Sequence, residues 1–233
     1  MNEIWELLKY QFQITFIDDS RYQLFITGIK NPLIITVVAI IIGVVIGSLV
    51  AIVRVYNYQS GKFKILSKLC GIYLAIFRGT PIVVQLLIIY YIIFASLNNA
   101  ILVAIIAFGL NSGAYVAEIV RAGILAVDIG QLEAGESLGL PYNRTMRLII
   151  LPQAVKNILP ALGNEFIVLL KETSVAGYIT VFDLTRAGDY IRSRTMEPLV
   201  SLLFIALVYF VLVFILTYLV KKLERRLRQS DRG

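Results

Sequence analysis

Long runs of apolar residues, separated by short polar or charged segments, make up most of this sequence. A bilayer core about 30 Å thick requires about 20 apolar residues in a helix. The pattern therefore predicts five membrane-spanning helices, over residues 27–53, 79–97, 100–121, 148–170 and 198–220. The predicted fold is all-α: a polytopic helical membrane protein in which residues 1–233 form a single domain.

The fourth run is less regular than the other four. Three residues interrupt its helical pattern: Pro152, Pro160 and Gly163. Lys171 and Glu172 would be costly in lipid, so a break near Thr173, followed by a half-segment over 175–184, is as good a prediction as one straight helix. Broken backbone at membrane depth is stable only where protein or a water-filled cavity surrounds it. The run therefore indicates a pathway rather than a lipid-facing wall.

The first 20 residues predict a helix that lies in the membrane interface. Apolar side chains recur there at nearly helical spacing: Ile4, Trp5, Leu8, Phe12 and Phe16. Tryptophan is a typical interfacial anchor. This region has acidic residues and no basic start, so it does not read as a cleavable signal peptide. A poorly ordered terminus is the alternative interpretation.

Composition supports a membrane protein. Hydrophobic residues make up 58% of the chain, only 16% of residues are charged, and the mean hydropathy is +0.81. The single cysteine, Cys70, excludes an internal disulfide, and the absence of histidine argues against a typical zinc site. A net charge of +7 is compatible with nucleic-acid binding, but the basic residues flank apolar runs, as in membrane loops. No nucleic-acid partner is therefore expected.

The distribution of lysine and arginine predicts the orientation. The segments on one face are residues 54–70, 121–160 and 221–233, and those on the other are residues 1–30, 97–100 and 183–197. The first face holds 14 of the 22 basic residues and the second holds six. The positive-inside rule then places the carboxyl terminus in the cytoplasm and the amino terminus outside. The loop over residues 128–147 and the tail over 221–233 would also be cytoplasmic.

This cytoplasmic loop predicts a short, rigid helix. Residues from Gln131 to Leu138 can form about two turns, and Asp128 is a suitable N-cap. Gly139 suits the left-handed position that ends such a helix, and Pro141 prevents its continuation. A partner can hold such an element and pass its movement to the flanking spans. An ordinary amphipathic loop helix is the alternative.

The same loop resembles the permease subunits of ABC importers. Their cytoplasmic signature is Glu-Ala-Ala, three residues, Gly, nine residues, Ile, one residue and Leu-Pro. The matching positions, with every spacing kept, are Glu133, Ala134, Gly135, Gly139, Ile149, Leu151 and Pro152. The single departure is Gly135, which replaces the second alanine with another small residue.

Further motifs narrow the resemblance to the polar amino acid branch, the histidine, arginine and glutamine type of permease. RGTP occurs at 78–81 and is followed by Gln85, and the N-S-G-A-Y-x-A-E-I-x-R-x-G stretch covers 111–123. LPQA follows at 151–154 and a K-[DE]-T-S element at 171–174. Together these motifs cover most of residues 28–220 in order.

The resemblance implies a type I ABC importer in a prokaryotic inner membrane, with five helices and an exterior amino terminus. Two permease subunits, identical or paralogous, would assemble with two ATPase subunits, and an extracytoplasmic amino acid-binding protein would deliver the solute. The helix containing Glu133–Gly139 would sit in a groove of the ATPase. This chain would be no enzyme and would hold no cofactor, because ATP and Mg would bind the ATPase. It lacks the GxxxxGK[ST] phosphate-binding motif.

Polar residues at membrane depth are the candidates for the solute site. Asn164 and Glu165 lie near the middle of the fourth run, and a carboxylate there favours a basic amino acid such as arginine, lysine or histidine. Asn111 and Tyr115 share one face of the third run, with Ser112 beside it. We expect these five residues to line a small cavity for a polar L-amino acid, moved by alternating access.

Several alternatives stay open at this point. Glu165 could form a structural ion pair with a basic residue such as Lys171, and Asn111 and Tyr115 could serve only as hydrogen bonds between helices. The solute could be neutral or acidic, such as glutamine or glutamate, and an autonomous carrier or channel is a weaker alternative. Glu118 and Arg121 are expected to form a local ion pair or to contact the cytoplasmic loop. Gly43 and Gly47 predict close helix packing.

Overall fold

The computed structural model describes residues 2–229, and this part of the chain contains helices and no strand. The α-helices are α1 (Asn2–Phe12), α2 (Tyr22–Ser60), α3 (Lys64–Gly79), α4 (Ile82–Ile88), α5 (Ala100–Leu125), α6 (Ile129–Ser137), α7 (Tyr142–Thr145), α8 (Leu151–Glu172), α9 (Leu184–Thr195) and α10 (Pro198–Gln229). Short π or 3-10 segments are η1 (Gln13–Ile17), η2 (Asp18–Ser20), η3 (Ile89–Ile93), η4 (Met146–Ile150) and η5 (Thr173–Ile179). The predicted all-α class is confirmed.

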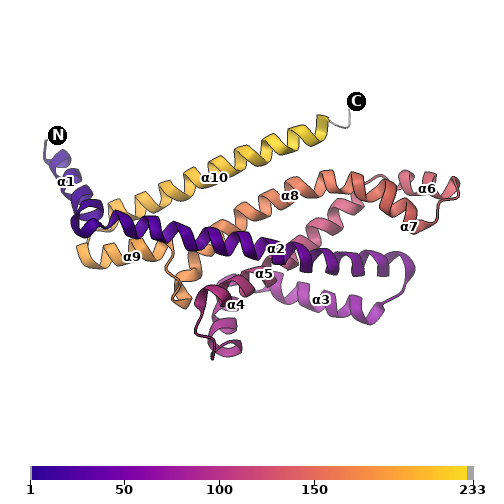
Figure 1. The fold of residues 1–233 in the computed structure, drawn as a ribbon, viewed down its shortest axis with the longest axis horizontal. Coiled ribbons are helices and arrows are strands. Elements are labelled where there is room, and N and C mark those ends of the chain that lie inside the picture. Colours follow the sequence, from indigo (N-terminus) through magenta and orange to yellow (C-terminus); the bar gives the residue numbers. More distant parts are fainter. Residues whose placement is uncertain (1, 230–233) are drawn as a thin grey trace.

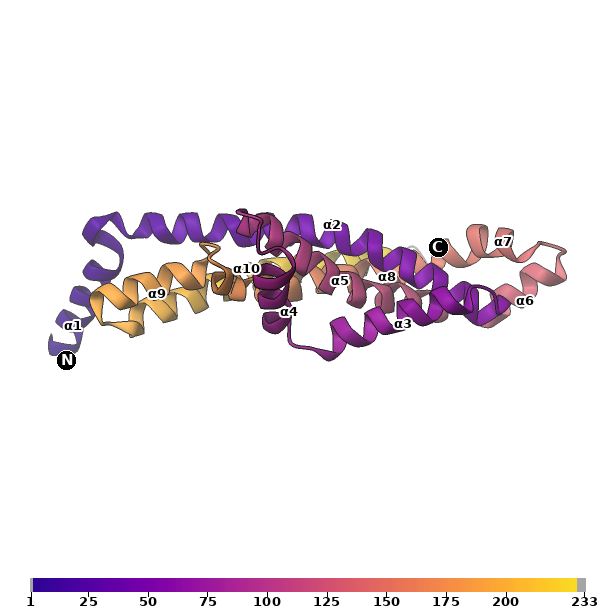
Figure 2. The same ribbon diagram turned by 90° about the horizontal axis from the view of Figure 1, so that it is seen from below.

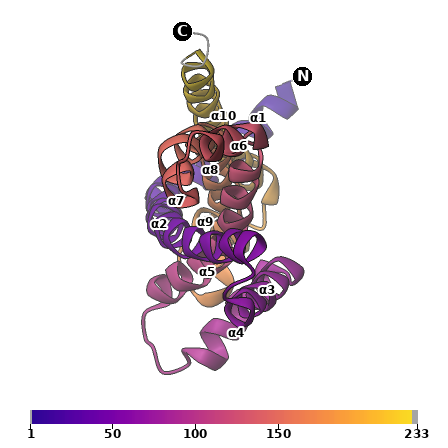
Figure 3. The same cartoon turned by 90° about the vertical axis from the view of Figure 1, so that its right-hand side faces the viewer.

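The long helices run roughly along one axis of an elongated molecule (Figures 1 and 2). Helices α1 and α9 lie at one end, whereas α6 and α7 lie at the other, with the carboxyl-terminal part of α10 extending toward it. Viewed along this axis, α3 and α4 lie on the side of the body opposite to α10 (Figure 3). The cytoplasmic or exterior assignment of each end remains a prediction from charge.

Within residues 2–229, three helices are long and apolar enough to cross a membrane: Tyr22–Tyr58, Ala100–Leu125 and Pro198–Leu227. Helix α3 and the segment Ile82–Ile93 together form a fourth candidate, bent by 110°. Helix α8 has 22 residues but falls short in hydropathy, because polar side chains interrupt its sequence. The count of five spans therefore stays a prediction.

The prediction of one span over residues 79–97 is wrong. The helix that reaches this region begins at Lys64 and ends at Gly79, and Ile82–Ile93 continues at an angle of 110°. Pro81 explains the break, because a residue before proline is driven into an extended conformation, and Thr80 has φ −123° and ψ 149°. The segment after the break has 12 residues. At 1.5 Å per residue it is about 18 Å long, too short for a bilayer core.

Helix α8 shows one correct and one incorrect expectation. Pro160 and Gly163 do not interrupt it, since the helix is continuous from Leu151 to Glu172. Gly163 instead permits close packing, because a Cβ there would lie 2.7 Å from the Val220 side chain of α10. The expected break near Thr173 is confirmed, as η5 begins at that residue.

Helices α2 and α5 form the centre of the fold, and glycines bring their backbones together. A Cβ on Gly43 would lie 3.0 Å from Ser112, and a Cβ on Gly47 would lie 2.7 Å from Ala117. The expected close packing at this GxxxG is confirmed. It positions the polar residues of α5 at a fixed height against α2.

The amino-terminal helix predicted over the first 20 residues is present as α1, followed by the short segments η1 and η2. Trp5 and Phe12 are 61% and 55% exposed, as expected for a helix with an apolar face toward lipid. Phe16 packs against Phe25 and Phe204, with ring centroids 5.5 and 4.8 Å away. The side chains of Ile4 and Leu8 lie outside the described residues.

Candidate functional site

The loop between α5 and α8 folds as its sequence predicts. Asp128 caps α6 through a hydrogen bond from the Gly130 amide to its carboxylate, with a distance of 2.7 Å. Gly139 has φ +76°, the left-handed conformation that favours glycine, and Pro141 precedes the first residue of α7. The loop is therefore two short helices joined by a tight turn, at one end of the molecule (Figure 1).

The outer face of α6 is exposed in the structure. Glu133 and Ala134 are exposed, and the large apolar side chains of Ile129 and Leu138 are 71% and 80% exposed. Exposed apolar side chains at the tip of a rigid element are typical of a protein interface.

The inner face of α6 rests on α7 through Gly135, which is buried. A Cβ at this position would lie 2.4 Å from Cγ2 of Thr145, and Thr145 is completely buried. The threonine side chain thus fills the space that the second alanine of the signature would need. Among the remaining signature residues, Ile149 is partly buried against a core formed by α2, α5, η4 and α8, whereas Leu151 and Pro152 begin α8.

The structure brings together two of the five predicted solute-site residues. Ser112 of α5 donates a hydrogen bond to Oε1 of Glu165 of α8 over 2.9 Å, and Glu165 is only 9% exposed. No ion pair joins a basic side chain to Glu165 within residues 2–229, so the alternative pairing with Lys171 is not formed. A buried carboxylate with a single neutral donor can still accept hydrogen bonds from a cation.

The other three residues lie elsewhere. The amide of Asn111 donates to Oε1 of Gln85 over 2.9 Å and to the Phe77 carbonyl over 3.2 Å. Gln85 itself donates to the carbonyls of Phe77 and Thr80, both at 2.9 Å. These amides therefore satisfy carbonyl groups freed where α3 breaks from α4. Tyr115 lies one turn along α5 beside Arg78, and Asn164 is exposed.

Near the end of α5, Glu118 lies in a cluster of arginines. Arg121 approaches its Oε2 over 2.7 Å, which confirms the expected local ion pair. Arg54 of α2 and Arg78 of α3 reach Oε1 over 3.1 and 3.8 Å. Sequence reasoning missed these two contacts, although both arginines stand at the ends of apolar runs, where charged side chains would meet at one depth.

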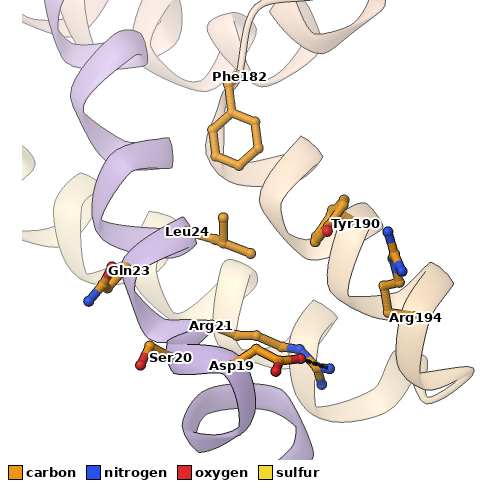
Figure 4. Close-up of a pocket in the computed structure, with 8 residues that line it drawn as sticks. All are labelled: Asp19, Ser20, Arg21, Gln23, Leu24, Phe182, Tyr190 and Arg194. Carbon is orange, nitrogen blue, oxygen red and sulfur yellow. Dashed lines mark hydrogen bonds and ion pairs between the residues drawn. The ribbon is translucent and has the colours of Figure 1, made fainter.

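A pocket of about 460 Å³ (Figure 4) lies beside α9, at the end of the molecule opposite to α6 (Figure 1). Its lining comes from η2 and the start of α2, and from α9 with the segment before it: Asp19, Ser20, Arg21, Gln23, Leu24, Phe182, Tyr190 and Arg194. Arg21 pairs with Asp19 over 2.8 Å, and the Arg194 guanidinium lies 5.4 Å from the Tyr190 ring. No local pattern in the sequence predicts this pocket, because residues far apart in the chain form it.

Asp183 is a further buried acid, in the segment between η5 and α9 and outside the spans. Its Oδ1 accepts a hydrogen bond from the Arg186 amide over 2.7 Å and so caps α9. Burial raises the pKa of Asp183 from 3.8 to about 6, although the backbone hydrogen bond from Arg186 acts in the opposite direction.

The chain is similar to known proteins over most of its length. A family model described as "Binding-protein-dependent transport system inner membrane component" matches residues 43–229. The arginine transport system permease protein of Bacillus subtilis is 39% identical over 207 residues, which cover 88% of this chain and 92% of the relative. A putative glutamine transport system permease protein of Rickettsia prowazekii is 39% identical, with 95% and 97% covered.

A solved structure also matches. The crystal structure of an amino acid ABC transporter with histidines superposes with a TM-score of 0.83 at 43% sequence identity. The match covers 91% of this chain and 98% of that chain.

Proposed function

Because the chain belongs to the family of binding-protein-dependent transport inner membrane components, as the permease subunit of an amino acid ABC importer, we propose that it carries a basic L-amino acid inward. The arginine-type solute would pass by alternating access, with the amino terminus outside and α6 in the cytoplasm. ATP hydrolysis would occur in a separate ATPase subunit, which would bind ATP and Mg.

The environment of Glu165 carries this proposal. Its carboxylate is buried in α8 and receives one hydrogen bond, from neutral Ser112. An ionised group at membrane depth is costly unless another charge compensates it. A solute with a cationic side chain would supply the compensating charge while it is bound, and its release would leave Glu165 without that charge. One of the relatives is named for arginine transport, in agreement with this reading.

Glutamine is the second candidate solute. The relative named for glutamine transport is as similar to this chain as the one named for arginine. A carboxylate also accepts hydrogen bonds from the amide of glutamine, although without compensating its charge.

Uptake by the purified importer, reconstituted with ATP inside liposomes, tests the choice of solute. We expect the wild-type importer to take up arginine in preference to glutamine. Glu165→Gln removes the charge but keeps the side-chain shape, and should lower arginine uptake at least about tenfold, which corresponds to about 1.4 kcal/mol. Glu6→Gln, an equal loss of charge at an exposed side chain of α1, serves as the control. Unchanged arginine uptake in Glu165→Gln would overturn the proposal, and preferred glutamine uptake would favour the second candidate.

We propose that α6 couples the ATPase to the spans, as the exposed Glu133 and Ala134 and the turn at Gly139 suggest. The full assembly would contain two ATPase subunits, a second permease that is identical or paralogous, and an extracytoplasmic amino acid-binding protein. Glu133→Arg reverses the charge on the exposed face of α6, and Gly139→Asp strains a left-handed residue. We expect both variants to lose the ATPase on purification, or to uncouple its activity from uptake. Normal coupled uptake in both variants would exclude this role for α6.

A further inference from the structure

The cluster around Glu118 carries more positive charge than its own acid neutralises. Within residues 2–229, Glu118 is the acid that pairs with all three arginines of the cluster, at distances of 2.7 Å (Arg121), 3.1 Å (Arg54) and 3.8 Å (Arg78). Guanidinium groups remain protonated in proteins. Three arginines and one glutamate therefore leave a net charge of two positive units at this place.

The arginines differ in how many of their N–H groups donate hydrogen bonds. Arg121 donates to Oε2 of Glu118 through both Nε and Nη2, at 3.0 and 2.7 Å. Arg78 approaches Oε1 only to 3.8 Å, beyond hydrogen-bond distance, and its guanidinium stands 5.7 Å from the Tyr115 ring. Because a guanidinium has five N–H groups, Arg78 keeps donors for a further anion.

A pocket of about 480 Å³ lies beside these donors. Its polar walls are Arg54, Arg78, Tyr115 and Glu118, and Leu74 and Ala75 supply apolar ones. A Cβ built on Gly79, which also lines the pocket, would meet nothing within 4 Å. The pocket therefore combines free space, spare donors and an apolar wall.

The depth of the cluster indicates what fills the pocket. Arg54 directly follows the apolar run 27–53, and Glu118 and Arg121 close the run 100–121. The end of α2 that carries Arg54 also points toward the end of the molecule with α6 (Figures 1 and 2). Tyr58 and Phe63, 84% and 61% exposed, lie nearby in the sequence and are typical of the membrane–water interface. These features favour a position at the level of the lipid phosphates for the cluster.

We propose that this pocket binds the phosphate group of an anionic phospholipid, in the leaflet on the α6 side of the membrane. Arginine binds phosphate through paired N–H groups, and basic pockets between membrane helices bind the headgroups of anionic lipids. The two surplus positive charges favour a lipid with net negative charge over a zwitterionic one. The glycerol end of the lipid would lie against Leu74 and Ala75. Lipid binding in this pocket is independent of which amino acid the importer transports.

Native mass spectrometry of the purified complex, incubated with phosphatidylglycerol or phosphatidylcholine, tests the proposal. We expect the wild type to retain phosphatidylglycerol in preference to phosphatidylcholine. Arg54→Gln and Arg78→Gln should each lower that retention about fivefold, since one basic residue near a membrane surface contributes about 1 kcal/mol to anionic-lipid binding. Arg78→Lys keeps the charge without the paired donors, and should retain more lipid than Arg78→Gln.

Lys68→Gln is the matched control, because it removes one charge from an exposed position of α3, the helix that carries Arg78. Lys68 lies outside the pocket. We expect its lipid retention to equal that of the wild type. Equal retention in Arg54→Gln, Arg78→Gln and the wild type would overturn the proposal. It would also fail if excess inorganic phosphate displaced the lipid completely, which would make the site one for a soluble anion. Displacement by free arginine would assign the pocket to the solute instead.

Discussion

Helix α5 carries one acid, Glu118, and contacts another, Glu165, less than two turns away along its length, and the surroundings of the two acids are opposite. Glu165, reached through Ser112, is buried, accepts one hydrogen bond from a neutral group and pairs with no cation in the described residues. Glu118, with a side chain 20% exposed, pairs with three arginines. The positive charge around Glu165 does not balance its carboxylate, whereas the positive charge around Glu118 exceeds that of its carboxylate.

The difference shows what each acid contributes. A charge without a partner at membrane depth destabilises the fold, so its presence indicates a task that the single chain does not complete. An acid shared by three guanidinium groups holds α2, α3 and α5 together near the interface. Glu165 is therefore the candidate for solute binding, and Glu118 is a structural centre with positive charge left over.

Neutralising each acid in turn should give the largest difference between the roles of Glu118 and Glu165. Glu118→Gln leaves three guanidinium groups without their shared anion, and should lower the free energy of unfolding by about 1 to 3 kcal/mol, between the effects typical of exposed and buried pairs. Glu165→Gln removes an unpaired buried charge and should leave stability equal or higher. Thermal unfolding of the purified variants in one detergent measures both. An equal loss of stability in the two variants would contradict the distinction.

A third acid, Asp183, is expected to have a smaller effect on stability, which depends on pH. Burial raises its pKa to about 6 from 3.8, so the folded state holds this proton more tightly than the unfolded state. Its contribution to stability is full below about pH 4 and is lost as the pH rises to about 6. Asp183→Asn keeps a capping side chain but cannot titrate.

The wild type should therefore gain stability relative to Asp183→Asn as the pH falls through this range. Unfolding temperatures measured for both proteins in the same detergent, from about pH 7 to about pH 4, give that difference. A difference that does not change with pH would exclude a titrating Asp183.

The sequence predicts features of the fold that neighbouring residues determine better than features that depend on contacts between distant segments. The cap at Asp128 and the turn at Gly139 follow from neighbouring residues, and both predictions are confirmed. At Thr173 the sequence leaves a break and a straight helix equally open, and the structure has the break. The break at Pro81 was also local, but the apolar run over 79–97 concealed it, because hydropathy alone does not register a lost backbone hydrogen bond.

The candidate site was predictable only in part, because it depends on contacts between helices. The sequence places Asn111, Ser112 and Tyr115 close together on one helix, yet in the structure they point to different neighbours. Only Ser112 meets Glu165, because α8 passes that side of α5. Asn111 is engaged at the break between α3 and α4, and no spacing rule in the sequence shows that pairing.

The contact between Gly135 and Thr145 has a consequence for evolution. The two positions share one volume, so a methyl group gained at 135 must be lost at 145. Relatives with alanine at the position of Gly135 should therefore carry a smaller residue at that of Thr145. Changing only one of the two positions at a time would leave the loop either overpacked or with a cavity. We expect the departure from the signature at Gly135 to be one half of a compensated pair, of which Thr145 is the other half.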